Sequence, residues 1–247
     1  MRTVKLTVAY DGTAFHGWQR QPDRRTVQGV LEESLAAILG ESIGITGAGR
    51  TDAGCHARGQ VASFVTGSRL PVYALPPTLN RALPGDVRVR AAEEAGEGFN
   101  ARRSAIARRY AYRLLNEDDL LHERYAWHPR RAVRPDALER ATRVLEGEHD
   151  FSVFRATGST PAEPRGAGSR ATGRAWEGGV QRDLVADHFL YHMVRGIVGT
   201  ALAVQDERDP AAAMRERVAS RDRARSGATA PPQGLTLEEV FYPEEAR

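Results

Sequence analysis

The order of strand-like and helix-like segments is the feature that most constrains how this chain can fold. Alternating apolar residues predict a strand over Thr3–Tyr10. A helical apolar period then runs from Thr26, which can cap a helix, to Gly40, which can end one. The segments that follow are a short strand at Ile43–Ile45, a strand at Gln60–Thr66, a short helix within Pro71–Leu83 and a strand at Asp86–Ala91. The resulting order, β-α-β-β-α-β, is that of a split β-α-β unit.

The pattern in the second part of the chain predicts a similar order. Its expected elements are strands at Arg108–Leu115, Phe151–Phe154, Val180–Val185 and Val240–Tyr242, and helices at Pro135–Glu146, Leu190–Leu202 and Ala211–Val218. Residues 156–179, rich in Gly, Ser, Thr, Pro and Arg, are expected to form a long mobile loop. Each unit alone buries little, so we expect an α+β fold in which two halves, 1–103 and 104–247, share one extended antiparallel sheet.

Length and composition exclude several classes of protein. The chain has 247 residues, and 41% of them are hydrophobic, which is too many for a disordered chain. Cys55 is the single cysteine, so an intrachain disulfide framework and a multi-cysteine zinc site are excluded. No apolar run approaches the roughly 18 residues that a bilayer span needs. The N-terminus enters a strand pattern directly, so we expect a soluble, cytoplasmic protein.

The basic residues are almost all arginine, and they are clustered. Lysine and arginine total 35, Lys5 is the only lysine, and the formal net charge is +3. Five arginines and no acid lie between Arg102 and Arg113, with Tyr110 and Tyr112 among them. A GC-rich genome would also favour arginine. However, guanidinium groups match phosphates and stack on aromatic rings, so the segregation of charge indicates a polyanionic partner.

The densest group of chemically useful residues lies in a glycine-rich stretch, Gly47–Gln60, between two expected strands. Asp52 is flanked there by Arg50, His56 and Arg58. Neighbouring cations favour the charged form of a carboxylate, and an ionised aspartate can act as a nucleophile or a base. The same local pattern also fits an aspartate that merely closes an Asx turn.

Several ordered motifs, spread over nearly the whole chain, resemble those of the TruA family of tRNA pseudouridine synthases. The strongest is Gly49-Arg50-Thr51-Asp52-Ala53-Gly54, followed by His56, which resembles the family's catalytic motif. The others are Tyr10–Thr13 with Gly17–Gln21, Thr26–Gln28, Leu79–Pro84, Phe99–Arg102 with Ala107–Tyr112, His192–Arg195 with Ile197–Gly199, and Thr229–Pro231 with Gly234–Leu235.

The resemblance implies a fold, a reaction and a set of site residues. It implies two ferredoxin-like halves with helices on one face of a shared sheet, a homodimer, and no cofactor or metal. It implies Asp52 as the catalytic aspartate and Tyr110 as the ring that stacks on the target uracil. It implies Arg50 as the arginine that pairs with Asp52 and helps to hold the flipped nucleotide. The substrate implied is the anticodon stem-loop of tRNA, at positions 38, 39 and 40. The candidates for further RNA contacts are Arg102, Arg108, Arg109, Arg195 and His56.

The chemistry of the reaction fits a single carboxylate. Pseudouridine formation breaks N1–C1′ and forms C5–C1′, with no oxidation, whereas glycosidases usually need a second carboxyl group. Asp52 could attack C1′ or remove a sugar proton, and the sequence leaves both routes open. A catalytically idle RNA-binding module and a hydrolytic nucleosidase are the competing interpretations. His188 and His192 have the spacing of zinc ligands on a helix, but Phe189 stands where the glutamate of that motif is needed. We expect Tyr112 in the core.

Overall fold

The computed structural model describes residues 1–156 and 165–243. The chain forms two compact units, and the first of them is discontinuous in sequence. Unit 1 consists of residues 1–106 together with the C-terminal residues from Thr236 on, and unit 2 consists of residues 107–235. The last strand of the chain therefore belongs with the N-terminal unit, although it follows the whole of unit 2 in sequence.

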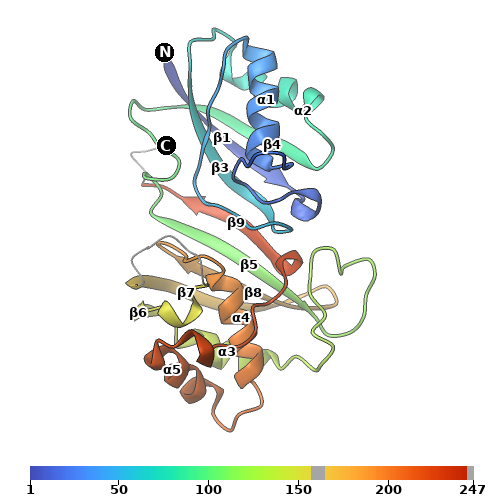
Figure 1. The fold of residues 1–247 in the computed structure, drawn as a ribbon, viewed down its shortest axis with the longest axis vertical. Helices are drawn as coiled ribbons and strands as arrows, with labels where there is room; N and C mark the ends of the chain where they lie inside the picture. Colours follow the sequence, from blue (N-terminus) through green and yellow to red (C-terminus); the bar gives the residue numbers. More distant parts are fainter. Residues whose placement is uncertain (157–164, 244–247) are drawn as a thin grey trace. The chain divides into compact units, whose positions relative to one another are not determined.

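Unit 1 is a sheet covered by two helices. Its elements are β1 (Arg2–Tyr10), α1 (Val27–Leu39), β2 (Thr46–Gly47), β3 (His56–Thr66), α2 (Leu75–Ala82), β4 (Val87–Ala95) and β9 (Leu235–Phe241). The strands lie in the order β4-β1-β3-β9, with β2 paired to β3. Figure 1 shows α1 and α2 together on one face of this sheet. The order of elements from β1 to β4 agrees with the expected split β-α-β unit.

Local sequence explains the first strand and helix. Val4, Leu6 and Val8 alternate along β1 and are fully buried, as the period of two predicts. Helix α1 begins after Thr26, whose hydroxyl accepts a hydrogen bond from Gly29 N over 3.3 Å. It ends at Gly40, which adopts a left-handed conformation with φ of 71°.

Two features of unit 1 differ from the sequence-based expectation. Ile43 and Ile45 are buried but form no strand, because side chains of α1 bind this main chain. Glu32 accepts from Ile45 N over 3.0 Å, and Gln28 donates to Ile45 O over 3.2 Å. The sheet is also not antiparallel throughout: β9 runs parallel to β3, with Thr236 opposite His56.

Unit 2 consists of further strands of the sheet and three helices. Its elements are β5 (Ala107–Leu115), α3 (Pro135–Arg143), β6 (Gly147–Asp150), β7 (Arg165–Trp176), β8 (Gly179–Ala186), α4 (Met193–Val204) and α5 (Pro210–Ser220). The strands lie in the order β5-β8-β7-β6, and the three pairings are antiparallel. The α+β class is confirmed.

The expected long loop at 156–179 is wrong over most of its length. Residues 165–176 form β7, which pairs along β8, while 157–164 lie outside the described residues. Its glycines serve close packing: a Cβ at Gly168 would lie 2.2 Å from Leu145 O, and one at Gly173 would lie 2.0 Å from an Arg182 nitrogen.

Two further boundaries in unit 2 differ from expectation. Residues 152–154 form a 3-10 turn instead of a strand, and the Asp150 carboxylate accepts from Ser152 N, at the first residue of the turn, over 3.0 Å. The predicted helix start at Leu190 is also too early. Helix α4 begins at Met193, directly after His192, whose φ of 62° is left-handed. His188 and His192 therefore do not share a helix face.

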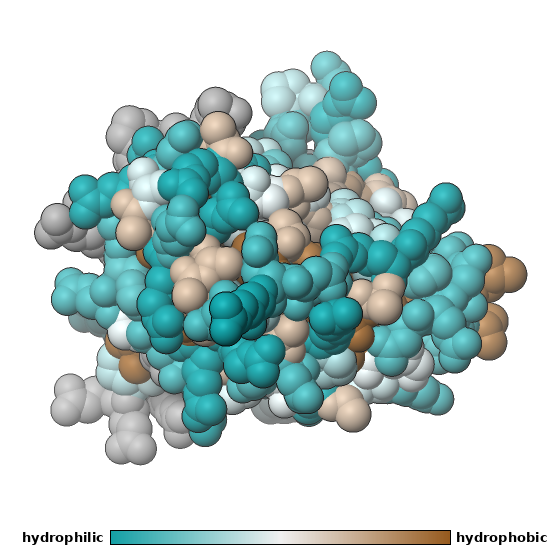
Figure 2. All heavy atoms as spheres, turned by 90° about the horizontal axis from the view of Figure 1, so that it is seen from below, coloured by the Kyte–Doolittle hydropathy of each residue, from teal (hydrophilic) through white to brown (hydrophobic). Residues whose placement is uncertain are grey.

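The surface is largely polar. The face drawn in Figure 2 is dominated by hydrophilic residues, with hydrophobic ones in small separate patches. Within the described residues, no helix combines the length and the apolar character required to cross a bilayer.

Candidate active site

The loop that carries Asp52 joins β2 to β3 in unit 1, and a buried glutamine of β3 holds its base. The Gln60 side chain is fully buried. Its amide nitrogen donates to Gly49 O over 2.8 Å, and its amide oxygen accepts from Gly49 N over 3.4 Å. A two-way hydrogen bond of this kind fixes the main chain three residues before Asp52.

The loop then makes a tight turn around Asp52. Cys55 N donates to Asp52 O over 3.1 Å, and Gly54 adopts φ of 78°, a left-handed conformation that favours glycine. The neighbouring Thr51 is buried, whereas Asp52 itself is half-buried, and Arg50 is exposed. A fixed main chain with a partly accessible carboxylate is what a catalytic aspartate requires.

Residues 10–18, which we call the bracing segment, pack against this loop. Both ends of the segment contact Thr51. The Tyr10 hydroxyl lies 2.7 Å from the Thr51 hydroxyl, and Trp18 N donates to Thr51 O over 3.1 Å. Trp18 is 2% exposed. Its indole therefore packs in the interior of unit 1.

The middle of the bracing segment touches the far side of the turn. Gly54 N donates to Phe15 O over 3.3 Å. A Cβ at Gly12 would lie only 1.8 Å from Cys55 O, so the two main chains meet without room for a side chain. Three residues of the loop, Thr51, Gly54 and Cys55, thus have their main chain in contact with the segment between β1 and α1.

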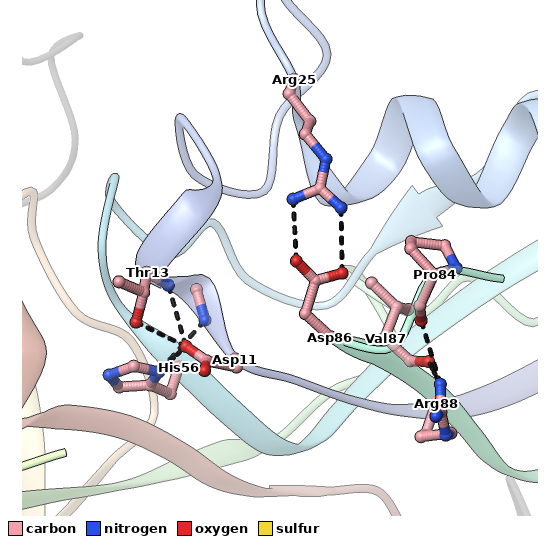
Figure 3. A network of polar contacts seen from close by, with 9 residues as sticks. Asp11, Thr13, Arg25, His56, Pro84, Asp86, Val87 and Arg88 are labelled. Atoms are coloured by element: carbon pink, nitrogen blue, oxygen red, sulfur yellow. Dashed lines mark hydrogen bonds and ion pairs between the residues drawn. The ribbon is translucent and has the colours of Figure 1, made fainter. Parts of the chain in front are cut away.

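His56 is the first residue of β3, and its imidazole points into unit 1. The side chain is almost entirely buried. Gly12 N donates to His56 Nδ1 over 3.1 Å, and an Asp11 carboxylate oxygen lies 3.2 Å from the same nitrogen (Figure 3). Asp11 also accepts from both the amide and the hydroxyl of Thr13. The structure thus places His56 beneath the bracing segment, rather than at the surface where RNA would contact it.

The two tyrosines that the sequence analysis singled out, Tyr110 and Tyr112, lie on β5 in unit 2. Tyr110 is 7% exposed and its ring meets the Phe189 ring edge-on, with centroids 4.9 Å apart. Tyr112 is fully buried, and its hydroxyl donates to Pro231 O over 2.8 Å. The expectation that Tyr112 belongs to the core is confirmed.

Three arginines of unit 2 are held by neighbouring groups. Arg108 donates to Asp187 O over 2.7 Å, Arg109 lies 3.3 Å from the Asp183 carboxylate, and Arg195 on α4 donates to Ala230 O over 2.7 Å. These bonds orient each guanidinium group, which carries five N–H donors. Arg102, in unit 1, is exposed.

Phe189 and Phe15 are the residues of this region that sequence reasoning missed. Phe189 was weighed only as the occupant of a metal-motif position, although an aromatic residue between His188 and Leu190 is itself a packing signal. Phe15 carries no such signal, because its role depends on the main-chain contact with Gly54.

A family model described as tRNA pseudouridine synthase matches residues 6–102 and 141–243. Relatives named tRNA pseudouridine synthase A occur in Acetivibrio thermocellus, Moorella thermoacetica and Geotalea daltonii. They are 38%, 41% and 42% identical, and each match covers 98% of this chain and 100% of the relative. A solved chain from a Cbf5-Nop10-Gar1 complex matches with a TM-score of 0.44 and 11% identity, over 96% of this chain and 59% of that chain.

The family match and the relatives together define the class as an isomerase that converts uridine to pseudouridine. Within that class, the chain belongs to the family of tRNA pseudouridine synthases named TruA.

Proposed function

We propose that this chain modifies uridines in the anticodon stem-loop of tRNA, with Asp52 as the catalytic carboxylate. The observation that carries the proposal is the half-buried Asp52 side chain on a loop whose main chain is fixed on both sides. An ionised carboxylate held in this way can stabilise positive charge at C1′, attack C1′, or take a proton from the ribose.

The reaction itself needs only an exchange of bonds. N1–C1′ breaks, the uracil turns, C5–C1′ forms, and the proton on C5 is lost while N1 gains one. The atoms therefore balance without an oxidant, a reductant or a leaving group. Because uracil must be recaptured rather than released, water has to be kept away from C1′. A site with one carboxylate among guanidinium groups meets this requirement better than a site with a pair of acids.

Tyr110 and Arg50 hold the target nucleotide in this proposal. Extrusion of the base from its stack costs a few kcal/mol, and an aromatic ring recovers about 1–3 kcal/mol by stacking. The Tyr110 ring is held edge-on by Phe189, which orients its faces. The exposed Arg50 guanidinium, two residues from Asp52, suits the phosphate or the base of the flipped nucleotide and pairing with Asp52.

The remaining arginines bind the RNA backbone. Arg102, Arg108, Arg109 and Arg195 are assigned to phosphates outside the target nucleotide. In this proposal the enzyme acts in the cytoplasm as a homodimer, and the division 1–103 and 104–247 separates the aspartate-bearing half from the half that carries Tyr110.

Tritium release tests this function. We incubate the chain with tRNA whose uridines carry tritium at C5, and we follow released tritium and free uracil. Tritium release without free uracil is expected, and Asp52→Asn should abolish it while tRNA affinity stays within severalfold. Asp23→Asn is the matched control, because Asp23 is exposed and its φ of 54° is tolerated by asparagine.

The other outcomes contradict the proposal in distinct ways. Free uracil would indicate a nucleosidase, and RNA binding without either product would indicate a binding module. Release of tritium by Asp52→Asn at the rate of the unchanged protein would remove Asp52 from the chemistry.

A further inference from the structure

Two charged residues outside the bracing segment form a bidentate ion pair beside it. The two terminal nitrogens of Arg25 donate to the two carboxylate oxygens of Asp86, over 2.8 and 2.9 Å. Figure 3 shows the guanidinium and the carboxylate aligned edge to edge. Arg25 lies directly before the cap of α1, and Asp86 lies directly before β4. The pair therefore connects the entry of a helix to the entry of a strand.

The two residues of the pair contact the bracing segment near its start, at Asp11, and in its second half, at Phe15 and His16. Asp11 N donates to Asp86 O over 3.0 Å, and His16 N donates to Arg25 O over 2.9 Å. Between these two main-chain bonds, the guanidinium carbon of Arg25 lies 3.9 Å from the centre of the Phe15 ring. Phe15 is in turn the residue whose carbonyl accepts from the loop of Asp52.

The geometry of the pair indicates orientation more than stability. The Arg25 and Asp86 side chains are 38% and 24% exposed, and ion pairs at that exposure contribute little to the free energy of unfolding. A bidentate ion pair whose guanidinium also stacks on a ring, by contrast, fixes the orientation of the two side chains as well as the distance between them. The hydrogen bond to Asp86 raises the pKa of Arg25, which favours the charged guanidinium that the ion pair requires.

We propose that Arg25 and Asp86 are positioning residues of the isomerase: through residues 10–18, they fix the loop from which Asp52 reaches the ribose. The inference rests on the proposed role of Asp52. The chain of contacts runs from the ion pair to Phe15, from Phe15 O to Gly54 N, and from Gly54 across the turn to Asp52.

The main competing role for Arg25 is direct contact with RNA. Arg25 borders a surface hollow that is also lined by Arg20 and Arg24, and such a hollow could bind a phosphate. However, both terminal nitrogens of Arg25 are directed at Asp86 and one face of its guanidinium covers Phe15. A lysine at this position would keep the charge but lose the fork and the stacking, which separates the two roles.

Arg25→Lys and Asp86→Asn test the proposal. In both variants we expect kcat for tritium release to fall about 10- to 100-fold, because a small displacement of a catalytic group is enough. The KM for tRNA should stay within about twofold of the unchanged protein, because no RNA contact is lost. Asp206→Asn is the matched control: it also removes a carboxylate paired with arginines, Arg131 and Arg134, and should leave both constants unchanged.

Hydrogen exchange gives a readout that does not depend on activity. The amide N–H groups of Trp18 and Gly54 donate hydrogen bonds that join the bracing segment to the loop of Asp52. Peptides covering 12–18 and 50–56 should therefore exchange about tenfold faster in both variants. Peptides from α1 should exchange as before. If Asp86→Asn does not fold, Arg25→Lys and Phe15→Leu carry the same measurement.

Each remaining outcome decides the question. A raised KM with unchanged kcat would assign Arg25 to RNA binding and overturn the proposal, and so would unchanged kcat with unchanged exchange. If the unchanged protein releases no tritium from any tRNA, the proposed function fails. Hydrogen exchange in Arg25→Lys would then still decide whether the ion pair holds the loop of Asp52.

Discussion

At the scale of single residues, Tyr110 and Tyr112 form a matched pair with different roles. Both lie on β5 and alternate onto the same side of the strand. Tyr110→Phe keeps an aromatic face for stacking, so tRNA affinity should remain within a few-fold of the unchanged protein. Tyr112→Phe loses the 2.8 Å bond to Pro231 O and should lower the free energy of unfolding by about 1 kcal/mol.

Fluorescence titration with tRNA and urea unfolding measure the two effects in the same preparations. A collapse of affinity in Tyr110→Phe would show that its role is not stacking. Unchanged stability in Tyr112→Phe would show that its hydroxyl bond contributes nothing net.

His122 is the residue from which a dependence on pH follows most directly. Its Nδ1 lies 2.6 Å from an Asp119 carboxylate oxygen, and this hydrogen bond raises the pKa of His122 above its ordinary value of 6.5. The same bond lowers the pKa of Asp119 below 3.8. The hydrogen bond to Asp119 stabilises the protonated imidazole. Its stabilisation is therefore complete below pH 6.5 and lost as the pH rises through the raised value.

Nuclear magnetic resonance of the His122 ring protons tests this prediction. The titration midpoint should lie above 6.5 in the unchanged protein and return toward 6.5 in Asp119→Asn. On the acid side, the contribution of Asp119 should disappear as the pH falls through its lowered pKa. An identical midpoint in both proteins would contradict the assignment.

At the scale of elements, the contact between the bracing segment and the loop of Asp52 predicts an asymmetry between two glycines. Gly12→Ala places a Cβ 1.8 Å from Cys55 O, so main chain must move, and the free energy of unfolding should fall by about 1–3 kcal/mol or more. Gly85→Ala is the control, because no atom lies within 4 Å of its Cβ position. Urea unfolding and tritium release check both, and equal stability of the two variants would contradict the close approach.

Elements whose signals are local could be predicted from the sequence, and elements that depend on distant partners could not. Helix α1 agrees with prediction because its cap, period and stop all lie between Thr26 and Gly40. The glycine, serine and threonine residues of β7 predict a mobile loop. The structure differs because pairing with β8 determines the conformation of this segment. The strand expected at Ile43–Ile45 begins only at Thr46, as β2, because side chains of α1 bind the main chain of Ile45.

The candidate site divides in the same way. The motif around Asp52 is contiguous, so the sequence alone identified it. The support beneath it is not contiguous: Phe15, Arg25 and Asp86 come from three segments, and their meeting depends on the tertiary fold. Burial likewise separated His56 from the exposed arginines, although both belong to the same basic pattern in the sequence.

At the scale of the whole molecule, the net charge of +3 is small, so binding to RNA depends on where arginines gather. Arg102→Gln should weaken tRNA binding and reduce the slope of log Kd against log salt by about 1 between roughly 50 and 200 mM. Arg208→Gln is the control, because Arg208 lies between the acids Glu207 and Asp209. Filter binding over this salt range measures both slopes. An unchanged slope in Arg102→Gln would exclude a phosphate contact there.

The parallel pairing of β9 with β3 has a consequence for the order in which the molecule is made. The strand that follows Asp52 acquires this neighbour only after the ribosome has synthesised all of unit 2. The fit is close, since a Cβ at Gly59 would lie 2.3 Å from Glu238 O. During translation, His56 and Ala57 of β3 therefore lack this partner until β9 has been synthesised, and unit 1 becomes complete only after unit 2 has been made.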